Sequence, residues 1–267
     1  VEEVRQEPAL STSTVSVFAF DQLLQEEPIQ HLRDPEPLLD LSIQFTSGTT
    51  SRPKAVVWTH ANILFAAQHS ARNYRLRHED ICQLFFPLFH MYALSPTLMS
   101  SLWVGGTVII QRRFSASNFW SPALRHKATW CAQIPFACQA LEKQAIPEHH
   151  FRFWTTGIAW PEVGSRFGIQ TLGTWGMTET VSCPITTDID HGAPYSCNGR
   201  PTPGYEIEIR RQDGSSCSRG ETGRLYLRGV RGITIFKEYL KNPQANNESF
   251  DEDGWFDTGD LIRIDEQ

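Results

Sequence analysis

The sequence lacks the features that mark a secreted, zinc-binding or membrane-spanning protein. Its six cysteines form no Cys-x-x-Cys pair and no Cys/His spacing of a zinc site, and a disulfide framework is not expected in a chain of this size. No apolar run is long enough to cross a bilayer, and the first residues carry no charged-then-apolar signal. We therefore expect reduced thiols, a cytoplasmic location and no integral membrane segment.

Basic tracts, internal repeats and low-complexity stretches are also missing. Lys and Arg total 24 against 30 for Asp and Glu, a formal net charge of −6, so nucleic acid is not an expected partner. The chain has no initiating methionine and stops directly after a strand-like run. Both ends therefore look cut, and we expect a piece of a longer protein. Nothing in the sequence indicates an oligomeric state.

What the sequence does contain is an ordinary globular composition with alternating strand and helix patterns. The 267 residues are 40% hydrophobic and 20% charged, which suffices for one large domain with or without a small subdomain. For a helix predicted at 115–127, Ser115 or Ser117 is the expected N-terminal cap. The alternation predicts an α/β fold with a mostly parallel sheet and helical cover. Periodicity predicts strands at 41–45, 55–58, 84–87, 108–110, 129–134 and 151–155, and helices at 18–24, 59–74, 94–103 and 115–127.

From about residue 199 the pattern changes to that of antiparallel hairpins. Residues 206–210 and 224–228 alternate apolar and polar side chains on either side of a turn at 212–215. We therefore predict two parts. The first is an α/β part at 1–199, and the second is a small antiparallel, barrel-like subdomain at 200–267.

A polar loop between two predicted strands carries the first functional signal. Residues 46–54 read Thr-Ser-Gly-Thr-Thr-Ser-Arg-Pro-Lys. Hydroxyl groups donate to phosphate oxygens, Gly48 lets backbone N–H groups turn inward, and Arg52 and Lys54 supply positive charge. The loop is not a Walker A motif, because a strand and not a helix follows it. Composition alone leaves two readings open, a phosphate-binding loop and an ordinary polar hairpin turn.

The complete string resembles the phosphate loop of the adenylate-forming superfamily, which includes acyl-CoA synthetases, adenylation domains of peptide synthetases and firefly luciferase. Further segments resemble that family's motifs in its own order: 86–90 for the substrate channel, 174–179 for adenine and magnesium, 220–229 for a strand, and 254–261 for ribose. Residues 50–54 and 232–245 look like the crotonobetaine/carnitine–CoA ligase branch of acyl-CoA synthetases. The resemblance covers about residues 40–267 and implies part of the family's large N-terminal domain. It implies that 1–199 is the nucleotide- and acyl-binding part, itself missing its N-terminal portion.

The resemblance implies a role for each matching residue. Glu179 would hold Mg²⁺ beside the ATP phosphates, since a carboxylate suits this hard cation. Thr178 would contact the α-phosphate and the acid. Trp175, where the family usually has Tyr, would stack on adenine, and Asp260 would accept the ribose hydroxyls. Without the resemblance these would be a surface carboxylate, a residue of a polar turn, a core tryptophan and a turn-capping aspartate.

Other expected site residues follow from the same motifs. His90 and Met91 would line the substrate channel rather than act as a general base. The expected catalytic residues are Lys54, Thr178 and Glu179. The remaining ATP contacts would be Thr46, Ser47, Gly48, Thr49, Thr50, Lys54, Gly157, Ile158, Ala159 and Gly176.

The implied reaction joins a carboxylic acid to a thiol at the expense of ATP. The acid would attack the α-phosphate to give an acyl-adenylate and pyrophosphate, and the thiol of coenzyme A would then displace AMP. The expected small-molecule partners are therefore a carboxylic acid, ATP, Mg²⁺ and coenzyme A. No protein nucleophile is needed, so the protein would supply positioning and charge neutralisation.

Some features depart from the family pattern. Ser51 and Ala55 stand where the family usually has glycine. The family's C-terminal domain, with the lysine that contacts the reacting groups, has no counterpart here, so we expect ATP binding but not the complete reaction. Residues 91–94 offer no carboxylate for a quaternary ammonium, so carnitine is not the expected acid. Two alternatives stay open: an adenylation domain that loads a carrier-protein thiol, and a non-catalytic nucleotide-binding remnant.

Overall fold

The chain divides into two units, residues 1–36 and 37–267, and the fold described below is that of the second unit. The computed structural model describes residues 22, 25, 27, 34, 36–46 and 53–265. The helix predicted at 18–24 therefore falls largely outside the described residues. The middle of the polar loop also falls outside them, namely Ser47, Gly48, Thr49, Thr50, Ser51 and Arg52.

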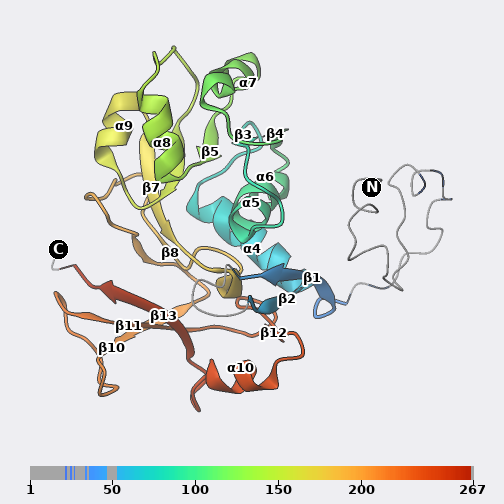
Figure 1. The fold of residues 1–267 in the computed structure, drawn as a ribbon, viewed down its shortest axis with the longest axis vertical. Coiled ribbons are helices and arrows are strands. Elements are labelled where there is room, and N and C mark those ends of the chain that lie inside the picture. The colour runs from blue at the N-terminus through green and yellow to red at the C-terminus, as the bar shows by residue number, and fades with distance from the viewer. Residues whose placement is uncertain are drawn as a thin grey trace, which may run out of the picture. The chain divides into compact units, whose positions relative to one another are not determined.

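The largest element of this unit is a seven-stranded sheet (Figure 1). Its first five strands in spatial order run parallel, and the last two are antiparallel additions. The spatial order is β4 (Thr107–Ile110), β3 (Ile81–Leu84), β5 (Trp130–Ala132), β6 (Phe153–Gly157), β7 (Gln170–Trp175), β8 (Ile185–Thr186) and β9 (Arg200–Pro201). The predicted α/β fold with a mostly parallel sheet is thus confirmed.

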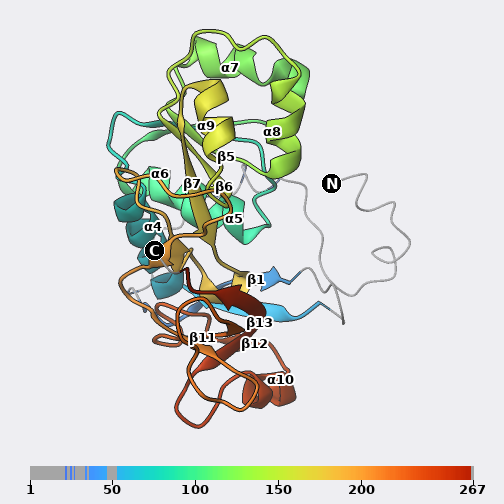
Figure 2. The ribbon, with the colours of Figure 1, turned by 90° about the vertical axis from the view of Figure 1, so that its left-hand side faces the viewer.

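Helices cover both faces of the parallel strands (Figures 1 and 2). Trp130 and Phe153 pack toward one helical layer, while their chain neighbours Cys131 and Trp154 pack toward the other. Side chains that alternate between two apolar layers are what a sheet buried on both faces requires. One layer holds α4 (His60–Asn73), α5 (Met91–Ala93), the π-helix Leu94–Met99 and α6 (Ser100–Trp103); the other holds α7 (Trp120–Arg125), α8 (Pro135–Glu142) and α9 (Pro161–Phe167). None of the described helices is both long and apolar enough to cross a membrane.

Two three-stranded antiparallel sheets complete the unit. One contains β10 (Glu206–Arg210), β11 (Thr222–Arg228) and β13 (Phe256–Arg263), and the alternating pattern predicted the first two of these strands. The other joins β1 (Asp40–Phe45) and β2 (Ala55–Thr59), which flank the polar loop, to β12 (Glu238–Tyr239). The short helix α10 (Pro243–Glu248) follows β12. The division of the chain at residues 199 and 200 stays a prediction.

Helix α4 begins with a complete capping box. Asn62 N donates to Thr59 Oγ1, and Thr59 N donates to Asn62 Oδ1, both at 3.1 Å. The same two buried side chains also reach the chain that leads into β12. Thr59 Oγ1 donates to the carbonyl of Gly232 at 2.6 Å, and Asn62 Nδ2 donates to the carbonyls of Ile233 at 2.9 Å and Ile235 at 2.8 Å. The start of this helix therefore fixes the path of a segment about 170 residues away in the sequence.

A buried histidine lies further along α4. The ring nitrogens of His69 lie 2.9 Å from Ser182 Oγ and 2.8 Å from Thr202 Oγ1, and Tyr205 meets the ring edge-on. Burial, with a smaller contribution from Arg72, lowers the pKa of His69 to about 4. The side chain is therefore a neutral hydrogen-bonding residue of the core at ordinary pH.

Three local predictions were wrong. The strand predicted at 84–87 is Ile81–Leu84, because the ladder with β4 ends at Leu84 and the apolar residues that follow belong to the core beyond it. The helix predicted at 94–103 begins at Met91 and is π-helical over Leu94–Met99, where Pro96 lacks the N–H of a regular turn.

The third concerns residues 115–127, which do not form one continuous helix. A 3₁₀ turn at Ala116–Asn118 precedes α7, and neither the turn nor the helix has a side-chain hydrogen bond at its N-terminal cap. The hydroxyl of Ser115 lies 3.2 Å from that of Ser117 instead. The two serines therefore pair with each other, which leaves no hydroxyl directed at the helix start.

Candidate active site

A cavity of about 970 Å³ opens at the carboxyl ends of the parallel strands. Its walls include Gln133 after β5, Gly157 at the end of β6 and Gly176 after β7. The hairpin of β1 and β2 contributes Thr46 and Lys54. Ligands of open α/β sheets bind at this edge, where loops of different strands converge. The structure therefore places Thr46 and Lys54, the two ends of the polar loop, beside the edge of the sheet where a ligand is expected.

Eight of the residues that the motifs singled out line this cavity. They are Thr46, Lys54, His90, Met91, Gly157, Gly176, Thr178 and Glu179. Trp175 and Asp260 lie just outside its lining, as do Ile158 and Ala159. Ser47, Gly48, Thr49 and Thr50 belong to the residues that the structure does not describe.

Glu179 is a buried carboxylate in the wall of the cavity. Glu179 is 3% exposed, and its Oε1 accepts a hydrogen bond of 2.8 Å from the hydroxyl of Tyr239. Burial raises the pKa of Glu179, while the Tyr239 hydroxyl and the charge of Lys54 act in the opposite direction. Glu179 is therefore not a surface carboxylate, and its burial next to a cation distinguishes it from a solvated side chain.

Lys54 and Tyr239 form the other side of this cluster. The Lys54 ammonium lies over the Tyr239 ring, 4.5 Å from its centroid. Thr46 N donates to the Lys54 carbonyl at 3.1 Å, and Lys54 N donates to Thr46 Oγ1 at 3.0 Å, which closes the hairpin on either side of the loop. Lys54, Tyr239 and Glu179 are thus in consecutive contact, each supplied by a different element.

Tyr239 is the residue that sequence reasoning missed. It lies within the segment 232–245 that carried part of the resemblance, but the pattern gave it no role. Its position depends on the pairing of β12 with β2, in which Tyr239 lies opposite Val56. A signal that would have found it is a pairing between strands far apart in the sequence, which periodicity does not contain.

The turn that carries Thr178 is held from two sides. The indole N–H of Trp58 donates to the Thr178 carbonyl at 3.0 Å, and the hydroxyl of Ser95 donates to the Val181 carbonyl. Val181, which ends the 3₁₀ turn Thr178–Thr180, has a φ of +54°, a strained conformation for a β-branched residue. The turn is therefore fixed with the side chains of Thr178 and Glu179 in the cavity wall.

Trp175 and Asp260 are joined by a hydrogen bond of 2.9 Å from the indole N–H to Oδ2. The interpretation of Asp260 as a turn-capping aspartate was wrong. Asp260 lies within β13, whose register with β11 shifts between Arg224 and Tyr226, and Gly259 takes a φ of +81° in the resulting bulge. A bulge of this kind redirects a side chain out of the regular strand pattern, here toward Trp175.

The loop after β6 is divided between the cavity and the core. Gly157 has a φ of +76° with open space around its α-carbon, and it lines the cavity. Ala159 is buried, and its backbone pairs with Cys197 and Ser196 at 2.7 and 3.0 Å. The carbonyl of Ile158 accepts from Thr156 Oγ1 at 2.6 Å. The roles of Gly157, Ile158 and Ala159 toward adenine stay predictions.

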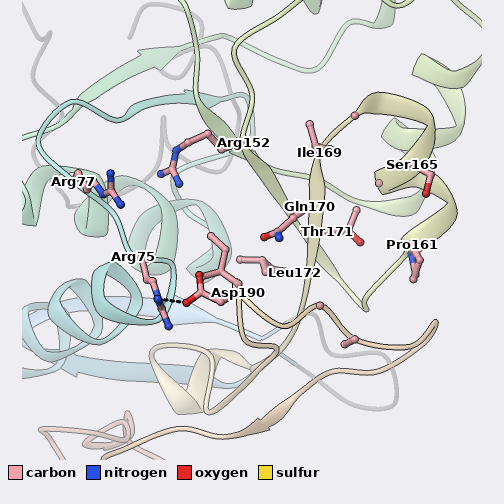
Figure 3. A pocket seen from close by; sticks show the side chains of 15 residues that line it. Arg75, Arg77, Arg152, Pro161, Ser165, Ile169, Gln170, Thr171, Leu172 and Asp190 are labelled. Atoms are coloured by element: carbon pink, nitrogen blue, oxygen red, sulfur yellow. Dashed lines mark ion pairs between the residues drawn. The ribbon is translucent and has the colours of Figure 1, made fainter.

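A second cavity, of about 760 Å³, lies at the opposite, amino ends of β6 and β7 (Figure 3). Arg75, Arg77 and Arg152 line it and would suit an anion if they were unpaired. However, Arg152 binds the buried carboxylate of Asp80 at 2.7 and 2.8 Å, and Arg75 pairs with Asp190. Because carboxylates already balance two of these three charges, the first cavity is the better site for an anionic nucleotide.

The sequence of the chain matches a known protein family. The profile of the family described as AMP-binding enzyme matches residues 2–240, which is most of the chain. The protein therefore belongs to the AMP-binding family, as its ordered motifs predicted.

Particular relatives narrow this class. The crotonobetaine/carnitine–CoA ligase of Escherichia fergusonii is 35% identical over 262 residues, covering 94% of this chain and 51% of that ligase. The ligase of the same name from Escherichia coli strain SE11 is 34% identical over 262 residues, with the same coverage. The chain thus spans about half the length of the curated relatives that it matches.

Solved structures show the same fold. O-succinylbenzoate Coenzyme A Synthetase from Bacillus subtilis in complex with ATP and magnesium ion superposes with a TM-score of 0.81 at 29% identity, covering 92% of this chain and 52% of that one. Its complex with AMP gives a TM-score of 0.80 with the same identity and coverage. The apo enzyme MatB from Rhodopseudomonas palustris, at 23% identity and a TM-score of 0.82, shares the fold.

Proposed function

We propose that this chain is the nucleotide-binding part of an acyl-CoA synthetase. The full reaction would convert a carboxylic acid and ATP into an acyl-adenylate and pyrophosphate, then transfer the acyl group to coenzyme A with release of AMP. The observation that carries the proposal is the buried Glu179 in contact with Tyr239 and close to Lys54, at the carboxyl edge of a mostly parallel sheet. The CoA ligases among its relatives support the same reaction class.

The side chains that could ligate a metal in this cavity fit magnesium bound together with a nucleotide. The described residues contain no cluster of three or more His, Cys, Asp or Glu side chains that would hold a metal alone. Glu179 offers one buried carboxylate, and Mg²⁺ commonly takes one or two carboxylates plus phosphate oxygens. Bound there, the ion would supply charge neutralisation at the phosphates.

The chain's own residues would position the reactants. The Lys54 ammonium would act as a point charge toward the phosphates, and the Thr178 hydroxyl would donate to the oxygens of the reacting centre. An oxygen of the acid attacks the α-phosphorus as the bond to pyrophosphate breaks. The thiol sulfur then bonds to the acyl carbon as the bond to AMP breaks, and the thiol proton is released. The protein lowers both barriers by orientation and electrostatics.

The acid would enter along His90 and Met91. His90 Nδ1 accepts from the backbone of Tyr92 at 3.2 Å, and burial lowers the pKa of His90, so the ring is a neutral part of the wall. Glu179 is the only acidic side chain among the described residues that line the cavity. Since Glu179 is assigned to magnesium, we propose an acid without a quaternary ammonium group.

The cytoplasm is the proposed location, because all six cysteines are unpaired and four of them are buried. We further propose that this chain binds ATP but does not complete both half-reactions alone. Transfer to a carrier-protein thiol and a nucleotide-binding remnant stay as alternatives. The favoured acceptor is coenzyme A, because the relatives at 34–35% identity are CoA ligases.

The proposal is tested by exchanging the buried carboxylate. We expect Glu179→Gln to lower acid-dependent pyrophosphate release by about 100-fold or more, since loss of electrostatic stabilisation has effects of this order. The assay uses the full-length gene product with Mg-ATP, coenzyme A and a panel of carboxylic acids. Glu162→Gln, an exposed carboxylate on α9, is the matched control and should leave the rate unchanged.

The same assay separates the alternatives. Unchanged release from the Glu179→Gln protein contradicts the assigned role. Release of pyrophosphate without acyl-CoA formation favours a carrier-protein acceptor. A protein that binds ATP in calorimetry but releases no pyrophosphate with any acid favours the remnant.

A further inference from the structure

The hydrogen bond between Trp175 and Asp260 links two sheets that are separate in the fold. Trp175 ends β7 of the seven-stranded sheet, and Asp260 lies in the bulge of β13 in the small antiparallel sheet. The indole N–H donates to one carboxylate oxygen, Oδ2, at 2.9 Å. A carboxylate can accept several hydrogen bonds, so Oδ1 keeps its capacity for a ligand hydroxyl.

The tryptophan is the fixed partner in this pair. Trp175 packs against two core clusters, one that contains Ile185 and Leu225 and one that contains Val181. The backbone after it is also fixed, because a β-carbon added at Gly176 would lie 2.5 Å from the carbonyl oxygen of Ser182. The indole N–H therefore points from a rigid frame.

Asp260 depends on that frame for its orientation. Its residue is exposed, and Gly259 before it has a φ of +81° with nothing near its α-carbon. A carboxylate on such a segment would sample several rotamers without a partner, and ordering it upon binding would cost conformational entropy. A hydrogen bond from a fixed indole removes most of this cost in advance.

We propose that Trp175 is a positioning residue, which holds the Asp260 carboxylate ready for the ribose hydroxyls of the nucleotide. The inference rests on the proposed nucleotide site and adds a determinant of sugar specificity to it. When a deoxyribose replaces ribose, a carboxylate that is held in place loses a hydroxyl as its hydrogen-bond partner. The indole N–H holds the carboxylate in place, so the ratio of the affinities for ribose and deoxyribose nucleotides depends on it. The same preference weakens when Asp260 can rotate away.

The test compares AMP with 2′-deoxy-AMP in calorimetric titrations of the 267-residue chain. Trp175→Phe keeps an aromatic ring and removes the N–H. We expect it to weaken AMP binding roughly three- to tenfold, which is the range for the net loss of one ordinary hydrogen bond. Binding of 2′-deoxy-AMP should change much less, so the ratio of the two affinities falls. In the Asp260→Ala background, Trp175→Phe should leave this ratio unchanged, because the partner is already gone.

Trp120→Phe is the matched control. Among the described residues the indole nitrogen of Trp120 is buried without a hydrogen-bond partner, so the same chemical change removes no hydrogen bond there. Both affinities should stay at the wild-type values. Equal weakening of AMP and 2′-deoxy-AMP by Trp175→Phe, or an unchanged ratio, overturns the positioning role while the nucleotide site stands. Absence of AMP binding in the wild-type chain overturns the proposed function together with the inference.

A second measurement does not require the Trp175→Phe protein to fold. In ¹⁵N-indole spectra, Asp260→Ala should shift a single indole N–H signal, that of Trp175, because the exposed Asp260 is its partner. In the wild-type chain this signal should keep its hydrogen-bonded position when AMP binds. Movement of the signal to the position seen in Asp260→Ala upon addition of AMP would show that the indole releases the carboxylate, which contradicts the proposal.

Discussion

Glu179 and His69 are ionisable side chains for which burial has opposite effects on the pKa. Burial raises the pKa of Glu179 and lowers that of His69, because in each case it disfavours the charged form. The Lys54 charge opposes the effect at Glu179, whereas the hydrogen-bond partners of His69 include two neutral hydroxyls. Glu179 is thus suited to bind a cation, and His69 to remain neutral.

The neutrality of His69 makes the protein sensitive to acid. Its pKa is about 4 in the folded state against an ordinary value of 6.5. As the pH falls through this window the unfolded chain takes up a proton that the folded protein does not. This contribution to stability is therefore present above pH 6.5 and lost toward pH 4. We expect the free energy of unfolding to fall by up to about 3 kcal/mol more in the wild type than in His69→Gln.

Urea denaturation at a series of pH values between 7 and 4 measures this difference in slope. His126→Gln changes an exposed histidine and should retain the wild-type slope. An equally steep fall in His69→Gln would show that other groups cause the acid sensitivity.

For single residues, the sequence predicted several that line the same cavity, but it did not predict the hydrogen bonds that hold them. The motifs singled out Thr178 and Glu179 because their order along the chain is distinctive, and both residues line the cavity, while their roles stay predictions. The donors that hold this turn, Trp58 and Tyr239, come from strands about 120 and 60 residues away. Hydrogen bonds of this kind depend on strand pairing and packing, for which a single sequence carries no local pattern.

Among the secondary-structure elements, strands with one solvent-facing side gave a clear pattern. Strands β10 and β11 are of this kind, so their side chains alternate in polarity. Strand β7 is buried almost throughout and contains Thr171, Gly173 and Thr174, so neither its polarity nor its composition separates it from a loop. Helices α8 and α9 begin with Pro135 and Pro161. Proline at the first helical position is a start signal that hydrophobic periodicity does not contain.

The start of helix α4 allows a test of how one element stabilises a segment that is distant in the sequence. Asn62→Ala removes the donors to the carbonyls of Ile233 and Ile235 and the acceptor for Thr59 N; the last two of these hydrogen bonds are buried and the first is partly buried. We expect a loss of about 3 kcal/mol in the free energy of unfolding, because each buried group left without a partner costs about 1 kcal/mol or more.

Chemical denaturation measures this loss. Gln68→Ala, at an exposed position of the same helix, should change the stability by less than about 0.5 kcal/mol. A similarly small effect of Asn62→Ala would mean that the capping box does not anchor the segment before β12.

For the molecule as a whole, the six thiols report on the integrity of the core. Cys82, Cys131, Cys138 and Cys183 are buried in it, whereas Cys197 and Cys217 are partly exposed. Burial raises the pKa of the Cys138 thiol to about 12 and that of Cys183 to about 11, which suppresses the reactive thiolate. The whole fold therefore limits thiol chemistry to two positions.

We expect no more than two thiols of the native protein to react rapidly with an aromatic disulfide reagent, and all six to react in guanidinium chloride. Absorbance of the released thiolate counts them. Replacing both Cys197 and Cys217 with serine should abolish the rapid phase. Rapid reaction of three or more thiols in the native state would contradict the described core.

The sheet of β1, β2 and β12 determines when the site can form during synthesis. Lys54 and the hairpin leave the ribosome early, but Tyr239 follows about 180 residues later, which corresponds to roughly 10–40 s of translation. Until then the Glu179 carboxylate lacks its hydroxyl donor. The strands of the seven-stranded sheet are therefore synthesised before the cavity wall can acquire this contact, which comes only with the pairing of β12 and β2.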